Sequence, residues 1–381
     1  MTEPNEVIVR PKIALFLPAL EGGGAERVFV ELANEFAAQG LNVDLVLASA
    51  WGPYVEDVSA VVRVIDFRAA SVLRSLPHVV RYLRSERPDV LLSALDHANV
   101  VSILARFVSA TRTRCVISVR SVPSKVYESA RSIRERALFR LIKSAYPFAD
   151  AIIANSEAVA ADLFRLMNLS QRKLHVLYNP LNTTRINELS MESVDDAWYS
   201  KKDSPIVLGV GSLTPLKDFV TLIRAFAIVR ASRDCRLVIL GEGPERSAIE
   251  SAISDLGLEQ DVYLPGFINN PFALMRQAAV FVSSSLTEGC PNALMQALAC
   301  GARVVSTDCV GGSGEILQQG KWGTLVPVGD AHAMADSIVT SLDADDVPDG
   351  RQRAYDFKPE NVARQYLEVL LPKYSRAVLG D

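Results

Sequence analysis

Glu288 is the residue whose surroundings most clearly predict chemistry. It lies in the segment 285–301, SLTEGCPNALMQALACG, after an apolar run (280–285) typical of a buried strand and before a run (292–300) typical of a helix with Pro291 at its first position. A carboxylate on this loop lies at the carboxyl end of a strand, beside the free N–H groups of a helix start. In an open α/β sheet ligands bind there, and a helix N-terminus favours an anion. The segment therefore predicts a ligand site.

The predicted helix that follows carries a polar side chain in need of a partner. Residues 293–300 are apolar on nearly every side except at Gln296. We therefore expect the helix to be buried and the Gln296 amide to need a hydrogen-bond partner. A ligand hydroxyl would supply one.

Two glycine-containing loops offer groups for phosphate. GVGSLTPLKDFVTLIRAF (209–226) follows an apolar run and leads into a predicted helix, so that its glycines permit close backbone approach and Lys217 can reach a phosphate. FLPALEGGGAERV (16–28) places three bare N–H groups at a strand-to-helix turn. Neither loop has the G-x-G-x-x-G or the G-x-x-x-x-G-K-[ST] spacing, so a dinucleotide enzyme and a P-loop kinase are not indicated.

Polar side chains also follow two other predicted strands. SALDHANVV brings Asp96, His97 and Asn99 to the ligand crevice at one strand end, and VISVRSVPSK brings Arg120 and Ser121 to another. His97 and Arg120 are candidate catalytic residues, although a lone histidine is commonly a structural hydrogen-bonding group and Arg120 fits a strand-end ion pair as well as an anion site.

The elements that position these residues form two series of Val/Ile/Leu-rich runs without alternation, which is typical of parallel strands covered on both faces. The predicted strands begin near 13, 43, 62, 89, 115, 151 and 175, and then near 206, 235, 262, 280, 302 and 323. Helical patterns separate them, so the chain is an α/β protein with two doubly wound, Rossmann-like domains. We place the domains at 1–182 and 183–356, followed by a terminal amphipathic helix in 357–381, and expect a linker plus a loop between Pro180 and Pro205.

These motifs resemble the family 4 retaining glycosyltransferases, which have the GT-B fold of two such domains facing a cleft. The E-x7-E signature of that family is matched by Glu288 with Gln296 in the second position, and its G-R-L-x-x-x-K loop by 211–217 with Ser212 in place of the arginine. GGGAERV also matches. The likeness extends from Ile13 to about Leu370.

The resemblance implies roles for individual residues. In the family the first acid contacts donor-sugar hydroxyls, the second holds the nucleotide ribose, the lysine grips the diphosphate and the glycine loop faces the diphosphate. It further implies that a histidine near the position of Arg120 is replaced here, and that the terminal helix crosses back onto the first domain. The donor-binding set predicted in this way is Gly22, Gly23, Gly24, Ser212, Gly243, Ile268, Pro291, Asn292, Ala293, Leu294 and Gln296, and the catalytic set is Glu288, Lys217, His97 and Arg120.

Composition and charge fit a globular enzyme with an anionic partner. Net charge is −4, yet the stretch 63–143 has sixteen Lys or Arg against six acids. The N-terminus lacks a signal-peptide core, no apolar run has the length of a membrane span, and the five cysteines show no C-x-x-C pair, so we expect a cytoplasmic protein with reduced thiols and no zinc site. The basic run 120–143 favours docking on anionic lipid at the inner face of the membrane, against the plainer interpretation of a solvated helix.

The function implied by the resemblance is metal-independent transfer, with retention, of a sugar from a nucleoside diphosphate, with UDP as the expected nucleotide, to a lipid-linked or polysaccharide precursor in surface glycan biosynthesis. No cofactor is expected, because the nucleotide-sugar is a substrate, and no nucleic acid is expected as a partner. Two alternatives stay open: a UDP-sugar 2-epimerase-like enzyme, and a weakened or non-catalytic GT-B partner subunit suggested by Ser212 and Gln296.

Overall fold

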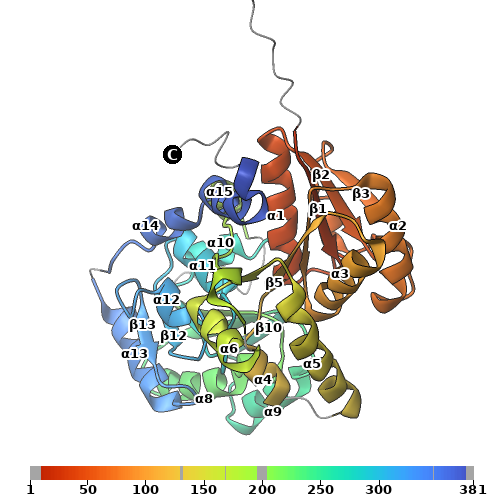
Figure 1. Ribbon diagram of the computed structural model, residues 1–381. Helices are drawn as coiled ribbons and strands as arrows, with labels where there is room; N and C mark the ends of the chain where they lie inside the picture. Colours follow the sequence, from red (N-terminus) through yellow and green to blue (C-terminus); the bar gives the residue numbers. More distant parts are fainter. Residues whose placement is uncertain (1–9, 129–131, 168, 195–203, 346, 375–381) are drawn as a thin grey trace, which may run out of the picture. The chain divides into compact units, whose positions relative to one another are not determined.

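The computed structural model describes residues 10–128, 132–167, 169–194, 204–345 and 347–374 (Figure 1). These residues form two compact units. Unit 1 takes the described residues of 1–155, 159–180 and 359–381, and unit 2 takes those of 156–158 and 181–358. The chain thus passes from unit 1 to unit 2 next to Pro180, two residues before the boundary placed from sequence.

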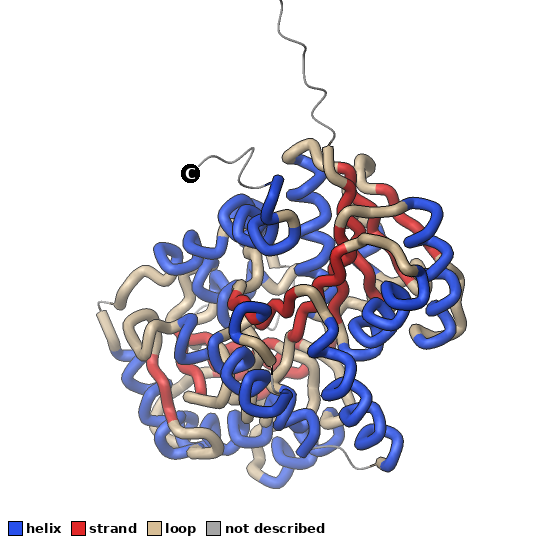
Figure 2. The backbone as a smooth tube through the Cα atoms, in the orientation of Figure 1, coloured by secondary structure: helices blue, strands red, loops and turns tan. Residues whose placement is uncertain are grey.

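Unit 1 is built on a seven-stranded parallel sheet in the order β3-β2-β1-β4-β5-β6-β7. The strands are β1 Lys12–Leu17, β2 Asn42–Leu47, β3 Arg63–Asp66, β4 Val90–Ala94, β5 Arg114–Val119, β6 Ala151–Ala154 and β7 Leu174–Val176. Every residue of the central strand β4 is buried, because helices cover both faces of the sheet (Figure 2).

Unit 2 repeats this design with a six-stranded parallel sheet in the order β10-β9-β8-β11-β12-β13. Its strands are β8 Ile206–Val210, β9 Arg236–Leu240, β10 Val262–Gly266, β11 Val280–Ser283, β12 Val304–Thr307 and β13 Thr324–Val326. The α/β prediction with two doubly wound domains is confirmed, and all thirteen predicted strands are present.

Strand order reverses once in each sheet, between β1 and β4 in unit 1 and between β8 and β11 in unit 2. Such a reversal separates the loops at the carboxyl ends of the two strands and leaves a crevice where α/β proteins bind ligands. The segments that follow these four strands carry the Gly22–Gly24 turn, Asp96 at the start of the next helix, Lys217 and Glu288.

The helices lie between successive strands, except for the last three, which follow β13. They are α1 Gly24–Ala38, α2 Leu76–Glu86, α3 Asp96–Ser109, α4 Pro123–Glu128, α5 Ile133–Ala145, α6 Glu157–Met167, α7 Thr183–Ser190, α8 Phe219–Arg230, α9 Arg246–Asp255, α10 Phe272–Gln277, α11 Asn292–Ala299, α12 Ser313–Ile316, α13 Ala331–Asp343, α14 Arg351–Ala354 and α15 Pro359–Leu370.

The terminal helix α15 belongs to unit 1, although it follows unit 2 in the chain. Its buried residues Val362, Tyr366 and Leu370 share one apolar core with Val28 and Leu32 of α1, and the two helices lie side by side in Figure 1. Burial of an apolar stripe of this kind is what holds an amphipathic helix to its domain.

The predicted linker between Pro180 and Pro205 was wrong in part. Residues 183–190 form α7, which begins where the Asn182 side chain accepts a hydrogen bond from the Arg185 N–H at 3.0 Å. Ile186 anchors this helix in the interior. The rest of the predicted loop, 195–203, lies outside the described residues. In the same way Pro291 precedes α11 as its cap residue and does not form its first turn.

Candidate active site

The loops after β8 and β11 are joined at the strand-order reversal of unit 2. The Ser284 hydroxyl donates to the Lys217 carbonyl at 2.8 Å, and the Leu286 N–H donates to the Leu216 carbonyl at 2.8 Å. These bonds fix the backbone that carries Lys217 against the backbone that carries Glu288, so the two charged side chains are held within reach of each other.

Lys217 and Glu288 form an ion pair, in which the Lys217 ammonium donates to Glu288 Oε1. The Ser285 hydroxyl donates to the same oxygen at 2.7 Å. The exposed fraction is 27% for the Lys217 side chain and 12% for that of Glu288, so both charges are partly withdrawn from water. A ligand that carries both anionic and hydroxyl groups can bind here, with its anionic groups at the cation and its hydroxyl groups at the carboxylate.

A small pocket opens beside this pair. Of the residues predicted from sequence to bind the donor, Pro291, Ala293 and Leu294 line it together with Lys217 and Glu288. They come from the start of α11, where the first N–H groups of a helix have no partner within the helix itself. The structure therefore brings together five of the predicted residues at one place.

The loop after β12 supports Glu288 from behind. Gly311 has φ of +137°, and a Cβ there would overlap the Glu288 carbonyl, so this position requires glycine. The Gly312 N–H donates to the Gly289 carbonyl at 2.9 Å, and the Thr307 hydroxyl donates to the Ser285 carbonyl at 2.6 Å. Sequence reasoning missed the supporting role of this loop.

The other predicted donor-binding residues of unit 2 lie outside this pocket. Asn292 and Gln296 are half-buried on α11, and the expected burial of 293–300 is wrong at Ala293 and Gln296. Ser212 is exposed on the loop after β8. Gly243 lies against that loop, where a Cβ would overlap the Leu213 carbonyl, and Ile268 is half-buried on the loop after β10.

The glycine turn of unit 1 lies at the other strand-order reversal. Gly22 has φ of +106°, and its carbonyl accepts a hydrogen bond from the Tyr54 hydroxyl at 3.0 Å. Gly23 caps α1, and a Cβ there would overlap the Glu26 carboxylate. The Glu26 side chain thus folds back over the turn, and glycine leaves room for it.

Burial raises the pKa of the Glu26 carboxyl above its ordinary value. The nearby charge of Glu21 acts in the same direction, whereas the Glu26 backbone N–H and the Arg120 guanidinium oppose it. Ionisation of the Glu26 carboxyl therefore lowers the stability of the folded protein.

Arg120 is anchored within unit 1. Its guanidinium donates to the Asn179 amide oxygen, to the Ser118 hydroxyl at 3.3 Å and to the Tyr366 hydroxyl of α15 at 3.5 Å. The predicted strand-end ion pair is not what fixes it, since these partners are neutral. Because none of these hydrogen-bond partners is charged, the half-buried guanidinium can still pair with an anionic ligand.

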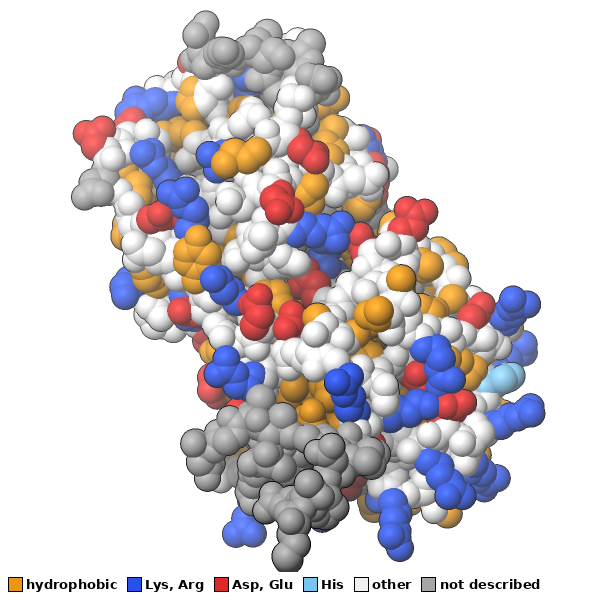
Figure 3. All heavy atoms as spheres, turned by 90° about the horizontal axis from the view of Figure 1, so that it is seen from above, with side chains coloured by type: hydrophobic (Ala, Val, Ile, Leu, Met, Phe, Trp, Pro, Cys, Tyr) orange, Lys and Arg blue, Asp and Glu red, His pale blue; other side chains and the backbone are white. Residues whose placement is uncertain are grey.

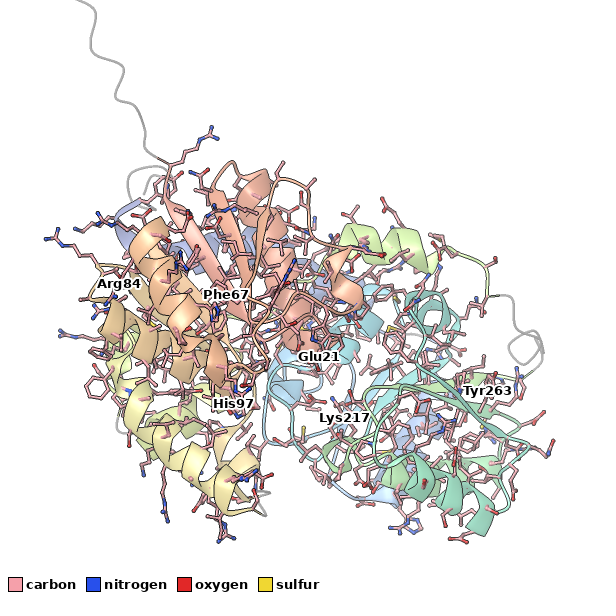
Figure 4. The ribbon with its side chains drawn as sticks, turned by 90° about the vertical axis from the view of Figure 1, so that its right-hand side faces the viewer. Glu21, Phe67, Arg84, His97, Lys217 and Tyr263 are labelled. Atoms are coloured by element: carbon pink, nitrogen blue, oxygen red, sulfur yellow. The ribbon has the colours of Figure 1, made fainter. Side chains whose placement is uncertain are left out.

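Asp96, His97 and Asn99 occupy three different environments at the start of α3. His97 is exposed (Figure 4), whereas Asn99 is fully buried and bonds to Ser93, Ser118 and Tyr146, so the expectation that Asn99 reaches the crevice was wrong. A buried amide satisfied on all sides has a structural role. Asp96 accepts a hydrogen bond from the Tyr146 hydroxyl at 2.7 Å.

The predicted basic run forms α4 and α5, with 129–131 between them outside the described residues. On α5 the cations Arg134, Arg136, Arg140 and Lys143 are exposed, and so is Ile133, whereas Ile142 is buried. Lys and Arg side chains also gather in the lower right part of Figure 3. The helix α2 carries the exposed Arg81 and Arg84. The positive charge of unit 1 is therefore spread over more than one helix.

The described residues show neither a cluster of metal ligands nor a membrane-spanning helix. Within the ranges given above, no three His, Cys, Asp or Glu side chains are grouped so as to hold a metal ion. None of the helices formed by those residues has both the length and the apolar character needed to cross a bilayer.

Comparison with known proteins decides the family. The model described as "Glycosyltransferase Family 4" matches residues 22–185, and the model described as "Glycosyl transferases group 1" matches residues 204–344. A protein from Campylobacter jejuni, N-acetylgalactosamine-N,N'-diacetylbacillosaminyl-diphospho-undecaprenol 4-alpha-N-acetylgalactosaminyltransferase, is 31% identical over 94% of this chain and 99% of its own length. The chain belongs to the family 4 glycosyltransferases.

A second relative and two solved structures are also similar to this chain. The lipopolysaccharide core biosynthesis glycosyltransferase LpsE of Rhizobium meliloti is 28% identical over 83% of this chain and 84% of its own length. Sucrose-phosphate synthase from Thermosynechococcus elongatus has a TM-score of 0.79 at 22% identity, covering 96% of this chain and all of that one. Anabaena HepE, solved with UDP, has a TM-score of 0.76 at 21% identity, covering 94% and 99%. The structural likenesses confirm the GT-B fold.

Proposed function

We propose that this family 4 glycosyltransferase moves a sugar from a nucleoside diphosphate to an acceptor hydroxyl with retention of anomeric configuration and without a metal ion. The observation that carries the proposal is the Lys217–Glu288 pair beside the start of α11 in unit 2. A nucleotide-sugar has an anionic diphosphate and a hydroxyl-rich ring, and the pair offers a cation for the one and a carboxylate for the other.

Each donor group has a partner in this proposal. Lys217 and the N–H groups of α11 bind the diphosphate, while Glu288 accepts hydrogen bonds from the sugar hydroxyls. The exposed hydroxyl of Ser212 adds a neutral contact to a phosphate, and the half-buried amide of Gln296 contacts the ribose. Uridine is the base we favour, because HepE of the same fold was solved with UDP.

Lys217 also supports transfer without a metal. As the bond between the anomeric carbon and the diphosphate oxygen breaks, negative charge grows on the diphosphate, and a preorganised cation stabilises that charge. The acceptor oxygen then bonds to the anomeric carbon on the face that the diphosphate leaves. The hydroxyl proton passes to the departing diphosphate, so atoms and charge balance and no covalent link to the protein is formed.

The acceptor in this proposal is a precursor of a surface glycan. The Campylobacter relative is named for an undecaprenol-diphosphate-linked acceptor, and the Rhizobium relative for lipopolysaccharide core synthesis. A lipid-linked acceptor lies at a membrane surface, and the exposed cations of α5 would attract anionic lipid there. In unit 1, the anchored guanidinium of Arg120 and the exposed imidazole of His97 are the groups that we assign to the acceptor.

A weakened partner subunit remains the second candidate. Ser212 and Gln296 replace a charged arginine and a glutamate in the family pattern, and both lie outside the pocket beside Glu288. Loss of those charges lowers donor affinity in either case. The two candidates differ only in whether bound donor turns over.

Donor hydrolysis followed by NMR tests the proposal. Protein freed of metals with EDTA is incubated with UDP- and GDP-sugars, and the anomeric proton of the released sugar is followed before mutarotation. We expect slow release of the same anomer as in the donor. Release of the opposite anomer, or turnover that requires an added divalent ion, contradicts the mechanism, and nucleotide binding without turnover favours the partner subunit.

A further inference from the structure

Unit 1 contains a cavity of about 180 Å³ at the carboxyl ends of β4 and β5, apart from the glycine turn. Its walls come from the start of α3, from α4 and α5, and from the end of α6. They are formed by Asp96, Val119, Ser121, Pro123, Val126, Tyr127, Glu135, Leu138, Phe139, Ile142, Tyr146 and Met167. No residue of the predicted catalytic or donor-binding sets is among them.

Most of the cavity wall is apolar, with an aromatic surface on one side. The rings of Tyr127 and Phe139 are stacked with their centroids 4.4 Å apart. Phe139 packs on the apolar core below, whereas Tyr127 is 43% exposed, so the stack leads from solvent to the interior. Aromatic faces of this kind bind the C–H face of a sugar ring or a methyl group.

Asp96 gives the cavity one oriented acceptor. The Tyr146 hydroxyl, which is fully buried, donates to Asp96 Oδ1 at 2.7 Å, and the buried Asn99 amide donates to that hydroxyl at 3.2 Å. Asp96 Oδ2 accepts no hydrogen bond from any described residue. A carboxylate with one oxygen fixed by a buried network and the other left for a ligand is preorganised to accept a hydrogen bond.

The backbone that presents Asp96 is itself strained. Leu95 has φ of 72° and ψ of 136°, a conformation that a leucine rarely adopts. Strain of this kind persists where the surrounding structure imposes it, and it is common at binding sites. Here it turns the chain from β4 directly into α3 and places the Asp96 side chain in the cavity wall.

We propose that this cavity binds a sugar residue of the acceptor that carries an acetamido or methyl substituent. The substituent and the ring face contact Tyr127 and Phe139, and a hydroxyl or amide N–H of the sugar donates to Asp96. This assignment rests on the proposed glycosyltransferase function, and the Campylobacter relative is named for an acceptor rich in acetamido sugars. A hydrocarbon chain fits less well, because it would leave the Asp96 carboxylate desolvated and without a partner.

Saturation-transfer NMR on the full chain tests the site with two probes, methyl N-acetyl-α-D-galactosaminide and methyl α-D-galactopyranoside. We expect the acetamido sugar to bind more tightly and its methyl protons to receive the strongest saturation. Asp96→Ala and Phe139→Ala should each weaken its binding at least about tenfold, as expected for the loss of one charged hydrogen bond or one aromatic contact. Phe148→Ala, which removes a 63% exposed ring outside the cavity, is the matched control and should bind normally.

Three results separate the possibilities. Equal binding of the two sugars, or normal binding by both cavity variants, overturns the proposal, as does displacement of the sugar by farnesyl phosphate at equal concentration. If Phe139→Ala fails to fold, Val126→Trp, which narrows the cavity from its exposed rim, should abolish binding instead. UDP titrated into the same samples tests unit 2 alone. If the wild-type protein does not bind UDP, that result counts against the proposed function and not against this site.

Discussion

The Lys217 ammonium donates to Glu288 Oε1, across the two loops that meet where the strand order of unit 2 reverses. The residues are 71 positions apart in the sequence, and the hydrogen bonds donated by the Ser284 hydroxyl and the Leu286 N–H hold their loops together. The pair keeps both partly buried charges neutralised until a ligand arrives. When a diphosphate binds Lys217, the Glu288 carboxylate loses the ammonium as its partner. Hydroxyl groups of the same ligand must then replace the ammonium at Glu288.

Gln296 tests whether the donor nucleotide extends along α11. Its amide is half-buried and lies outside the pocket beside Glu288. If the amide contacts the ribose, Gln296→Leu should weaken UDP binding by about 1–3 kcal/mol, because a ribose hydroxyl is left unpaired. Gln296→Glu should keep or improve the affinity. Calorimetric titration with UDP measures both, and an unchanged affinity in the leucine variant would show that Gln296 has only a structural role.

The requirement for glycine at position 311 can be tested against a second glycine. Gly311→Ala should distort the Glu288 backbone, because φ is +137° and the added Cβ would overlap the Glu288 carbonyl. We expect at least about a tenfold loss of donor affinity, because even a small displacement of a positioned active-site group is costly. Gly257→Ala is the control, since φ there is also positive but no atom lies within 4 Å of the added Cβ. Equal effects of the two changes on UDP binding would disprove the supporting role.

The raised pKa of Glu26 predicts a pH-dependent cost to stability. A carboxyl whose pKa is higher in the folded than in the unfolded protein destabilises the fold once pH exceeds the folded-state pKa, and this penalty disappears as pH falls to the ordinary value of 4.5. Glu26→Gln should therefore raise Tm by on the order of 2 °C at pH 7.5 and by less at pH 5. Thermal unfolding between these pH values measures the difference.

Glu56→Gln supplies the control for this measurement, since Glu56 is an exposed carboxylate in the same unit. Its effect on Tm should be small at both pH values. A Glu26→Gln effect that is the same at pH 5 and pH 7.5 would show that burial of the charge is not its cause.

The cations of α5 predict binding to anionic membranes. Arg134, Arg136 and Arg140 are exposed, and each cation near an anionic surface contributes about 1 kcal/mol. Changing all three to Glu should lower co-sedimentation with anionic vesicles at least about tenfold at low salt, with no effect on neutral vesicles. Changing the exposed Arg74, Arg81 and Arg224 to Glu alters net charge equally and should matter less. Equal losses of vesicle binding in the two triple variants would show that net charge determines the binding and that α5 is not a specific docking helix.

The strands and the loops after them could be predicted from sequence because parallel, doubly covered strands have a continuous apolar pattern. Lys217 and Glu288 were predicted for the same site, and their ion pair follows from the order of strands β8 and β11. The helix at 183–190 escaped notice because its signals are local and weak: one capping side chain, Asn182, and one fully buried apolar residue, Ile186.

What sequence could not supply were side-chain contacts between distant segments. Asn99 carries the same functional groups whether it faces a ligand or a buried tyrosine, and only the packing of Tyr146 against α3 decides between them. The cavity beside Asp96 is likewise lined by apolar residues of α4, α5 and α6, which have no common motif. The supporting role of Gly311 depends on the approach of two backbones and leaves only a glycine in the sequence.

Turnover of a nucleotide-sugar by Lys217→Ala and Glu288→Ala variants tests the central claim most directly. With EDTA present and the donor that the wild-type protein turns over fastest, each variant should lose on the order of 100-fold or more in turnover, as for removal of one charge-stabilising group. Arg224→Ala, which removes an exposed cation from the same unit, should keep wild-type turnover. Wild-type rates in both site variants, with their folding unchanged, would contradict the assignment of the Lys217–Glu288 pair to the donor.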